Sequence, residues 1–279
     1  MNPTAGNHTG GTGAGLDDTN LLRYSRQIIM EEIDETGQLR LGDASVLVVG
    51  IGGIGGPACL YLAGAGVGRI GLVDFDQVDL SNLQRQIIYG DDDLGRPKTA
   101  AALERMEALN DQINIVPHHT RLDHNNAEQL VKAYDLVIDA SDNFATRLVL
   151  NRACIAMERP MISAALSRFE GQIGIFAPAL GAPCYACLYP MAELPDNLSR
   201  CDLVGVFGPI AGMLGACAAG EAIKLVLKIG TSLAGSLMLI DLLDLRIQKM
   251  WVQPREDCQT CQPRRNQAQK DLSCTTTMT

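Results

Sequence analysis

Two pairs of cysteines in the sequence have the spacing of metal ligands. Cys184 and Cys187 form one Cys-x-x-Cys pair, and Cys258 and Cys261 form a second pair after 70 intervening residues. Four thiolates are a complete tetrahedral ligand set for Zn²⁺, and such a set leaves no open position for chemistry. A redox-active dithiol is the main alternative, but two pairs in a pattern unlike thioredoxin favour zinc. The spacing therefore predicts a structural zinc site.

A glycine-rich segment has the spacing of a phosphate-binding turn. Residues 50–56 read GIGGIGG and satisfy the pattern G-x-G-x-x-G, and Asp74 follows 19 residues after Gly55. Glycines let the backbone bend sharply and approach a phosphate, while an acidic residue at this distance can accept a hydrogen bond from a ribose hydroxyl. The same glycines also occur in tight strand–helix junctions that bind nothing. The segment fits a nicotinamide-dependent oxidoreductase and other nucleotide-binding proteins equally well.

Polar and charged side chains are concentrated after Asp74, where a hydride-transfer enzyme usually has an ordinary helix. These residues are Asp76, Asp79, Ser81, Asn82, Arg85 and Lys98. The two cations among them could face a triphosphate, or they could be solvated surface charges that pair with the acidic residues 91–93. Asp142 lies in the sequence DASDN of residues 139–143, which follows a strand-like run. At the carboxyl end of a strand, this carboxylate could hold Mg²⁺ between phosphate oxygens.

Short apolar runs alternate with helical segments along the chain, and these elements must position the candidate residues. We expect strands at residues 45–50, 69–74, 113–117 and 135–140, and helices at 97–110, 125–133 and 145–157. Further strands are expected at 160–163, 171–177, 236–241 and 245–252. Apolar strands that are separated by helices imply a mostly parallel sheet with helices on both faces. The predicted fold class is therefore α/β, with a Rossmann-like sheet.

No linker divides the chain into two domains. We expect a disordered leader at residues 1–19, one domain over residues 20–262 and a polar tail at residues 263–279. Residues 177–202 are expected to form a long loop, and long loops inside compact domains are usually functional. Cys201 lies in this loop, and a loop thiol without a role is one interpretation of it.

Composition and charge exclude some classes of protein. The 279-residue chain has 23 Lys and Arg against 32 Asp and Glu, and the resulting net charge of −9 argues against nucleic-acid binding. Residues 203–220 carry no charge, but their glycines and the charges at Glu221 and Lys224 favour a buried helix over a membrane span. Since the N-terminus resembles no export signal, we expect a cytoplasmic protein with reduced thiols.

Several sequence segments resemble one family, and they occur in the family's order. They are RYSRQ (23–27), GIGGIGG (50–56), DFDQVDLSNLQRQ (74–86), GRPK (95–98), DASDN (139–143) and the two Cys-x-x-Cys pairs. From about residue 20 to residue 262 the chain is similar to the ThiF-type adenylating enzymes related to ubiquitin activation. This family includes molybdopterin-synthase adenylyltransferase and thiamine sulfur-carrier adenylyltransferase. The resemblance implies a Rossmann-like half that binds nucleotide and an antiparallel half that binds a carrier protein.

The activity that the resemblance implies is transfer of AMP from ATP to the C-terminal glycine carboxylate of a small ubiquitin-like sulfur carrier ending in Gly-Gly. A separate protein is then expected to supply the sulfur. By the resemblance, Asp74 binds the ribose, Arg26 enters the site of the partner in a homodimer, and Cys201 can form a covalent link with the carrier or the sulfur donor. Asp142 coordinates Mg²⁺. The other residues implied at the nucleotide site are Gly53, Ser81, Asn82, Arg85, Lys98 and Asn143.

The chemistry of this reaction agrees with the residues present. A carboxylate that attacks a phosphate must overcome repulsion between anions, so cations and Mg²⁺ carry most of the catalysis. No general base is needed, because the carboxylate is already ionised near neutral pH. Two other classes of function stay open, a nicotinamide-dependent oxidoreductase and a non-catalytic adaptor for a ubiquitin-like partner. The motifs do not separate the molybdopterin pathway from the thiamine pathway.

Overall fold

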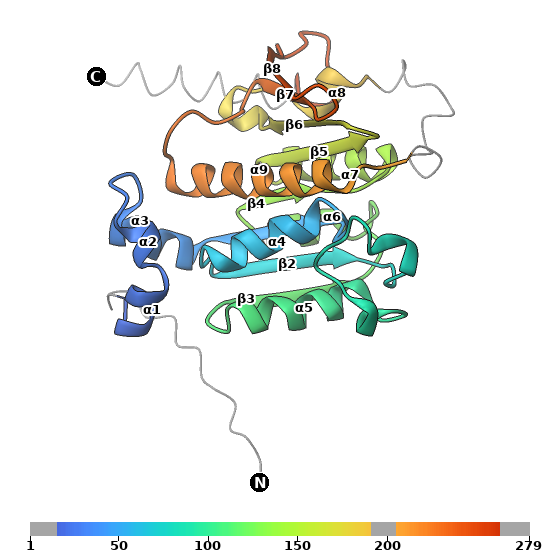
Figure 1. Ribbon diagram of the computed structural model, residues 1–279. Helices are drawn as coiled ribbons and strands as arrows, with labels where there is room; N and C mark the ends of the chain where they lie inside the picture. Colours follow the sequence, from blue (N-terminus) through green and yellow to red (C-terminus); the bar gives the residue numbers. More distant parts are fainter. Residues whose placement is uncertain (1–15, 191–204, 263–279) are drawn as a thin grey trace, which may run out of the picture.

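An eight-stranded sheet runs through the protein (Figure 1), whose computed structural model describes residues 16–190 and 205–262. The strands are β1 (Ser45–Val49), β2 (Arg69–Asp74), β3 (Asn114–His119), β4 (Leu136–Asp139), β5 (Met161–Ser167), β6 (Glu170–Phe176), β7 (Ser236–Asp241) and β8 (Arg246–Trp251). Their order in the sheet is β3-β2-β1-β4-β5-β6-β7-β8. The first five in this order are parallel, and β6, β7 and β8 continue the sheet in antiparallel pairs. The predicted Rossmann-like α/β fold with an antiparallel continuation is confirmed.

Helices connect the parallel strands and precede the first of them. The α-helices are α1 (Asp18–Arg23), α2 (Ser25–Ile28), α3 (Asp34–Asp43), α4 (Gly55–Gly64), α5 (Lys98–Leu109), α6 (Ala127–Lys132), α7 (Phe144–Ala156), α8 (Tyr185–Leu188) and α9 (Gly208–Leu227). Short 3-10 helices are η1 (Leu80–Asn82), η2 (Asp91–Asp93) and η3 (Pro178–Leu180). Since α1 begins at Asp18, the last two residues of the expected leader are helical. The rest of that leader up to residue 15 and the expected tail lie outside the described residues.

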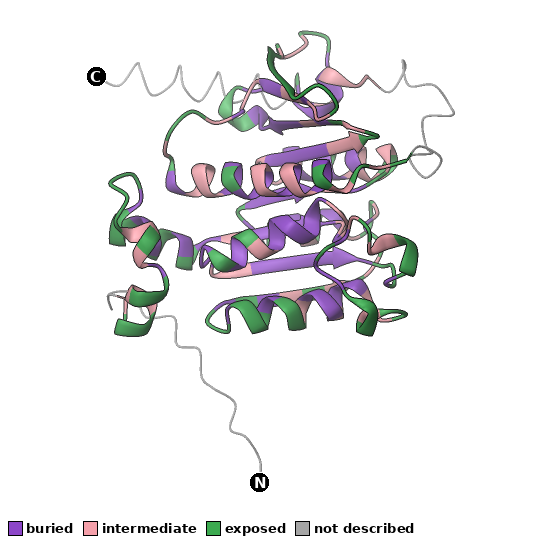
Figure 2. Ribbon diagram, in the orientation of Figure 1, coloured by how far each residue is buried: buried purple, intermediate pink, exposed green. Residues whose placement is uncertain are grey.

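Both faces of the sheet are covered, and each face has its own apolar core (Figure 2). Neighbouring residues of β1 point to opposite faces, because side chains alternate along a strand. Val46 and Val48 belong to the core beneath α4, α5 and α9, whereas Leu47 and Val49 belong to the core beneath α6 and α7. Burial on both faces explains why the strand reads as one continuous apolar run.

The helix α9 is the one helix of the described residues that is long and apolar enough to cross a membrane by length and composition. It packs against α4 and the sheet, and it buries Ile210, Leu214 and Ala218 among other side chains. This packing agrees with the expected buried helix, although the helix starts at Gly208 rather than at residue 203. Pro209 lies in its first turn, where a missing N–H leaves no hydrogen bond unmade.

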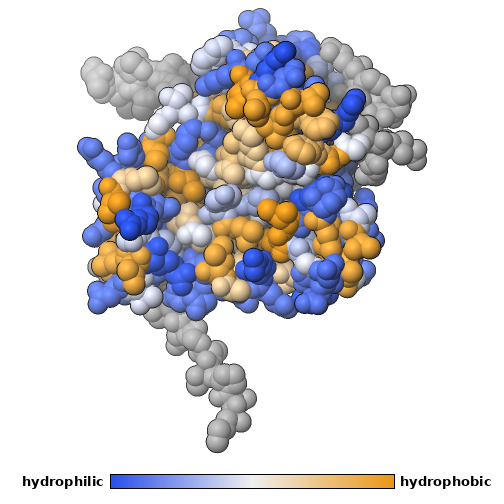
Figure 3. All heavy atoms as spheres, viewed as in Figure 1, coloured by the Kyte–Doolittle hydropathy of each residue, from blue (hydrophilic) through white to orange (hydrophobic). Residues whose placement is uncertain are grey.

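The strand β8 forms one edge of the sheet, and all six of its residues are exposed. Trp251, the only tryptophan of the sequence, ends this strand with 73% of its surface exposed. Lys249 Nζ lies 5.1 Å from the centre of its ring. The edge strand β8 therefore presents both apolar and charged side chains to its surroundings, and Figure 3 shows apolar and polar surface side by side at the top of the molecule, where β7 and β8 lie.

Candidate functional site

A cavity of about 510 Å³ lies at the carboxyl ends of the parallel strands. Most of its lining residues come from the ends of the strands and the segments that follow them, at 49–50 and 52–54 for β1, 73–76 for β2, 120–124 for β3, and 140–143, 145–147 and 149 for β4. The strand β1 pairs with β2 on one side and with β4 on the other. The chain therefore continues from β1 toward one edge of the sheet and later returns to add β4 on the other side of β1, so the strand order reverses at this point. Open α/β sheets bind their ligands in the crevice at such a switch point.

The glycine-rich turn after β1 is required by close backbone approaches. Gly50 has a φ of 86°, a conformation that side chains disfavour, and a Cβ there would lie 2.7 Å from the carbonyl oxygen of Ala140. A Cβ at Gly55 would lie 1.9 Å from the carbonyl oxygen of Gly50. The tight turn brings the start of α4 against the end of β1, so backbone N–H groups border the cavity, as phosphate binding requires.

Gly55→Ala is expected to lower the free energy of unfolding by about 3 kcal/mol or more, because the added methyl group must displace backbone atoms. Gly52→Ala is the matched control, since the nearest atom to its Cβ would be Gln86 Nε2 at 3.7 Å, an ordinary contact. Denaturant unfolding followed by circular dichroism measures both variants. Similar midpoints for the two would contradict the close packing of the turn.

Asp74 is held at the end of β2 with both carboxylate oxygens directed at the glycine-rich turn and its own loop. Oδ2 accepts a hydrogen bond from the Ile51 N–H at 2.7 Å, and Oδ1 accepts one from the Asp76 N–H at 2.9 Å. Burial raises the pKa of this carboxyl above its ordinary value, and the positive charge of Lys98 opposes the rise. Each carboxylate oxygen retains a further lone pair, so the group can also accept from a ribose hydroxyl.

Two cations that the sequence indicated lie in the wall of the cavity. Lys98, the first residue of α5, has a side chain that is 7% exposed, and its Nζ lies 3.1 Å from Asp76 Oδ2. Arg85 lines the cavity near Gly53, and its Nη1 donates to the carbonyl oxygen of Ser81 at 2.8 Å. Two cationic side chains therefore lie in the cavity wall, together with the carboxylates of Asp74 and Asp76.

Asp142 and Asn143 line the cavity in the turn between β4 and α7. The side chain of Asn143 accepts a hydrogen bond from the Thr146 N–H at 2.9 Å, which caps α7, and its amide donates to Asp142 Oδ1 at 3.2 Å. The Asp142 carboxylate is exposed. It can therefore coordinate a cation from this edge of the cavity.

Within the part of the chain that the structure describes, some residues that the sequence indicated do not line the cavity. Ser81 and Asn82 belong to η1 instead, where the side-chain oxygen Oδ1 of Asn82 accepts a hydrogen bond from the Asp79 N–H at 3.3 Å. Arg26 is exposed on α2, away from the cavity lining. Cys201 lies outside the described residues.

Sequence reasoning missed other side chains that line the cavity. Arg147 on α7 lies there with 6% of its surface exposed. Phe75 and Arg121 also line it, and the Arg121 guanidinium lies 4.0 Å from the centre of the Phe75 ring. Phe75 directly follows Asp74, which was a usable signal, whereas nothing local distinguishes Arg147 from a surface arginine.

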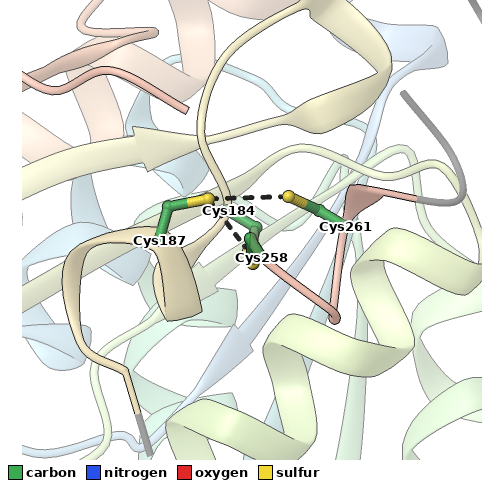
Figure 4. Close-up of side chains that lie close together, drawn as sticks. All are labelled: Cys184, Cys187, Cys258 and Cys261. Atoms are coloured by element: carbon green, nitrogen blue, oxygen red, sulfur yellow. Dashed lines mark hydrogen bonds between the residues drawn. The ribbon is translucent and has the colours of Figure 1, made fainter. Parts of the chain in front are cut away.

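The four paired cysteines form one buried cluster (Figure 4). The Sγ atom of Cys184 lies 3.7 Å from the Sγ atom of Cys187 and 3.7 Å from that of Cys258. The Sγ atoms of Cys187 and Cys261 are 3.5 Å apart. Zn–S bonds of about 2.3 Å in a tetrahedron place sulfurs about 3.8 Å apart, whereas a disulfide needs about 2.05 Å. The arrangement thus fits Zn²⁺. It joins α8 to the segment after β8.

The fold and the cavity together define a Rossmann-like nucleotide-binding protein. The sequence model of the ThiF family matches residues 24–261, and the chain belongs to this family. The predicted family is confirmed.

Curated relatives have similar sequences over most of this chain. "Adenylyltransferase and sulfurtransferase MOCS3" of Aedes aegypti is 43% identical over 247 residues, which are 88% of this chain and 56% of that protein. "Sulfur carrier protein adenylyltransferase" of Thermus thermophilus is 42% identical over 86% of this chain and 90% of its own length. "SAMP-activating enzyme E1" of Haloferax volcanii is 42% identical over 88% and 90%, respectively. The chain spans about half the length of the MOCS3 relatives.

Solved structures share the fold. The crystal structure of E. coli MccB with MccA-N7isoASN has a TM-score of 0.76 and 25% identity, and the match covers 86% of this chain and 74% of that chain. The structure of E. coli MccB with ATP has a TM-score of 0.74 at 23% identity, covering 86% and 73%.

Proposed function

We propose that the protein is an ATP-dependent adenylyltransferase that activates the C-terminal glycine carboxylate of a ubiquitin-like sulfur carrier as an acyl-adenylate. The observation that carries the proposal is one cavity lined by the glycine-rich turn, Asp74, Arg85, Lys98 and Asp142. The names of the curated relatives support the same activity, and they do not favour a nicotinamide-dependent oxidoreductase.

Each part of ATP has a counterpart in the cavity. Asp74 would accept a hydrogen bond from the ribose, and Gly53 would leave room for the phosphates to approach the backbone. Arg85 and Lys98 would neutralise phosphate charge, Asp142 would hold Mg²⁺, and the amide of Asn143 would hold the Asp142 carboxylate. Bound Mg²⁺ would supply further neutralisation of charge when the carboxylate attacks the α-phosphate and pyrophosphate leaves.

A groove next to the cavity has the position that the tail of a carrier requires. A second cavity of about 490 Å³ follows β5, β6, β7 and β8, and it shares Ala165 and Leu166 with the nucleotide cavity. Gln172, Leu239 and Gln248 are cross-strand neighbours along it. A Cβ at Gly171 would contact α9, so Gly171 faces the side of the sheet that α9 covers. Because side chains alternate along a strand, Gln172 faces the opposite side of the sheet, where the groove lies. An extended tail in this groove would end beside the phosphates.

Leu239→Arg is expected to raise the KM for the carrier about tenfold, because a charge replaces an apolar side chain in the groove. The affinity for ATP should stay unchanged. Ile247→Arg is the matched control, since Ile247 lies on β8 between two groove positions and points to the other face. Steady-state kinetics with varied carrier tests the pair, and equal KM values would argue against the groove.

The proposal includes a structural Zn²⁺ held by Cys184, Cys187, Cys258 and Cys261, which ties the segment after β8 to α8. It also includes a homodimer, because Arg26 is exposed on α2 and would reach the cavity of a second copy. None of the seven cysteines in the described residues forms a disulfide, which suits the proposed cytoplasmic location. Sulfur would come from a separate donor protein, in molybdopterin or thiamine biosynthesis.

Exchange of labelled pyrophosphate into ATP tests this function directly. Purified, metal-replete protein should catalyse exchange only when a small carrier protein ending in Gly-Gly is added. A carrier that lacks the last glycine serves as the control. Carrier binding without exchange would favour a non-catalytic adaptor, and hydride transfer to a nicotinamide cofactor would favour an oxidoreductase.

A further inference from the structure

A buried ion pair lies directly behind the turn that carries Asp142. Asp139 ends β4 with no exposed surface, and Arg147 in the first turn of α7 is 6% exposed. Arg147 Nε lies 4.0 Å from Asp139 Oδ2. Taking both charges out of water is costly, so a buried pair is weak evidence for stability. The contacts of the pair with the turn indicate its role.

The pair holds Ser141 from both sides. Arg147 Nη2 donates a hydrogen bond to the Ser141 carbonyl oxygen at 2.6 Å. Asp139 Oδ1 accepts from the Ser141 N–H at 3.1 Å and from the Ser141 hydroxyl at 2.6 Å. The hydroxyl of Ser163, on the neighbouring strand β5, donates to Asp139 Oδ2 at 2.7 Å. Charged groups therefore fix the backbone of the turn immediately before Asp142.

Asp142 itself is held only lightly. Among the described residues, its carboxylate accepts a hydrogen bond from the Asn143 amide at 3.2 Å, and the side chain is exposed. The direction of this carboxylate is thus set mainly by the backbone at Ser141. A movement of Ser141 would be passed on to Asp142 and to the start of α7.

We propose that Arg147 is a positioning residue that acts through Ser141 to aim the Asp142 carboxylate at the magnesium ion of bound ATP. Asp139 and Ser163 keep Arg147 and the turn in place. This inference rests on the proposed function. It assigns to Arg147 no contact with the phosphates or with the carrier, although the residue lines the cavity.

Calorimetric titration with ATP, in the presence of Mg²⁺ or of EDTA, separates this role from the others. Arg147→Lys keeps the charge but loses the planar group that reaches Ser141 and Asp139 together. We expect the affinity for ATP in EDTA to stay within about twofold of the wild type, and the tightening of ATP binding by Mg²⁺ to fall about tenfold. Ser163→Ala should give a smaller change in the same direction, and it covers the case in which Arg147→Lys does not fold.

Two matched controls should leave the response to Mg²⁺ unchanged. Arg69→Lys alters an arginine that donates to the Ala133 carbonyl oxygen at 3.1 Å and stacks on Tyr134 at the other ends of the strands. Ser236→Ala removes a buried serine hydroxyl from β7.

A wild-type response to Mg²⁺ in both Arg147→Lys and Ser163→Ala would overturn the inference. So would an unchanged Mg²⁺ response together with a raised KM for the carrier, because Arg147 would then contact the carrier directly. If the wild-type protein bound no ATP at all, the proposed function would fail first, which is a different result from a defect confined to Mg²⁺.

Discussion

Asp142→Ala is expected to reduce carrier-dependent pyrophosphate exchange about 10²- to 10⁴-fold. In the proposed site this carboxylate holds Mg²⁺ at the cavity, and neutralisation of phosphate charge is most of the catalysis in such a reaction. The fold should be unaffected, because Asp142 is exposed and, within residues 16–190 and 205–262, its carboxylate receives one hydrogen bond, from Asn143. Arg85→Ala should have a comparable effect, since it removes a cation beside Gly53.

Asp111→Ala is the control for this experiment, because Asp111 is also an exposed aspartate but lies in the loop before β3, away from the cavity. Carrier binding, measured separately by calorimetry, should be retained in Asp142→Ala and in Arg85→Ala. Exchange at the wild-type rate in both variants would remove the basis for the assigned nucleotide site.

Cys258→Ser is expected to abolish zinc binding and to lower the free energy of unfolding by about 3–5 kcal/mol, or roughly 10 °C in Tm. Three thiolates no longer close a tetrahedral site, and the metal is the group that would join the segment after β8 to α8. The remaining sulfurs are buried and close to one another, so their charges would repel without the ion.

Zinc content by atomic emission and unfolding by calorimetry are the two measurements. The wild type should contain one zinc per chain. Cys217→Ser is the control, because Cys217 is a free, half-buried thiol on α9 outside the cluster. A wild type without zinc, or a Cys258→Ser protein with wild-type zinc content and Tm, would show that the cluster has another purpose.

The sheet could be predicted from the sequence because its strands carry a local signal. The expected bounds of β2 and β7 agree with the structure residue for residue, and both are short apolar runs between turn residues. The helices α1 to α3 gave no such signal. These helices are largely exposed, and they contact residues that are distant in the sequence. For example, Asn110 Nδ2 donates a hydrogen bond to the hydroxyl of Tyr24, between α1 and α2, at 2.9 Å.

The sequence could predict only those residues of the candidate site that lie at a recognisable spacing from a strand or from one another. The glycine-rich turn, Asp74 and Asp142 each follow a strand, so parallel pairing alone brings them to one edge of the sheet. Arg147 escaped notice because its burial depends on Asp139 and on packing against distant segments. The cysteine quartet was visible as two pairs, but the approach of the pairs depends on the antiparallel strands between them.

The position of Trp251 makes its intrinsic fluorescence a useful probe of this edge of the sheet. As the only indole in the chain, and one that is largely exposed on β8, it should emit close to the wavelength of tryptophan in water. A carrier that covers this edge of the sheet would shift the emission to the blue, whereas ATP alone, bound at the far ends of β1 and β2, would leave it unaltered. Because Trp251 shares the face of β8 that carries Ile247, opposite the proposed groove, intrinsic fluorescence would test, separately from nucleotide loading, whether a docked carrier also covers this edge.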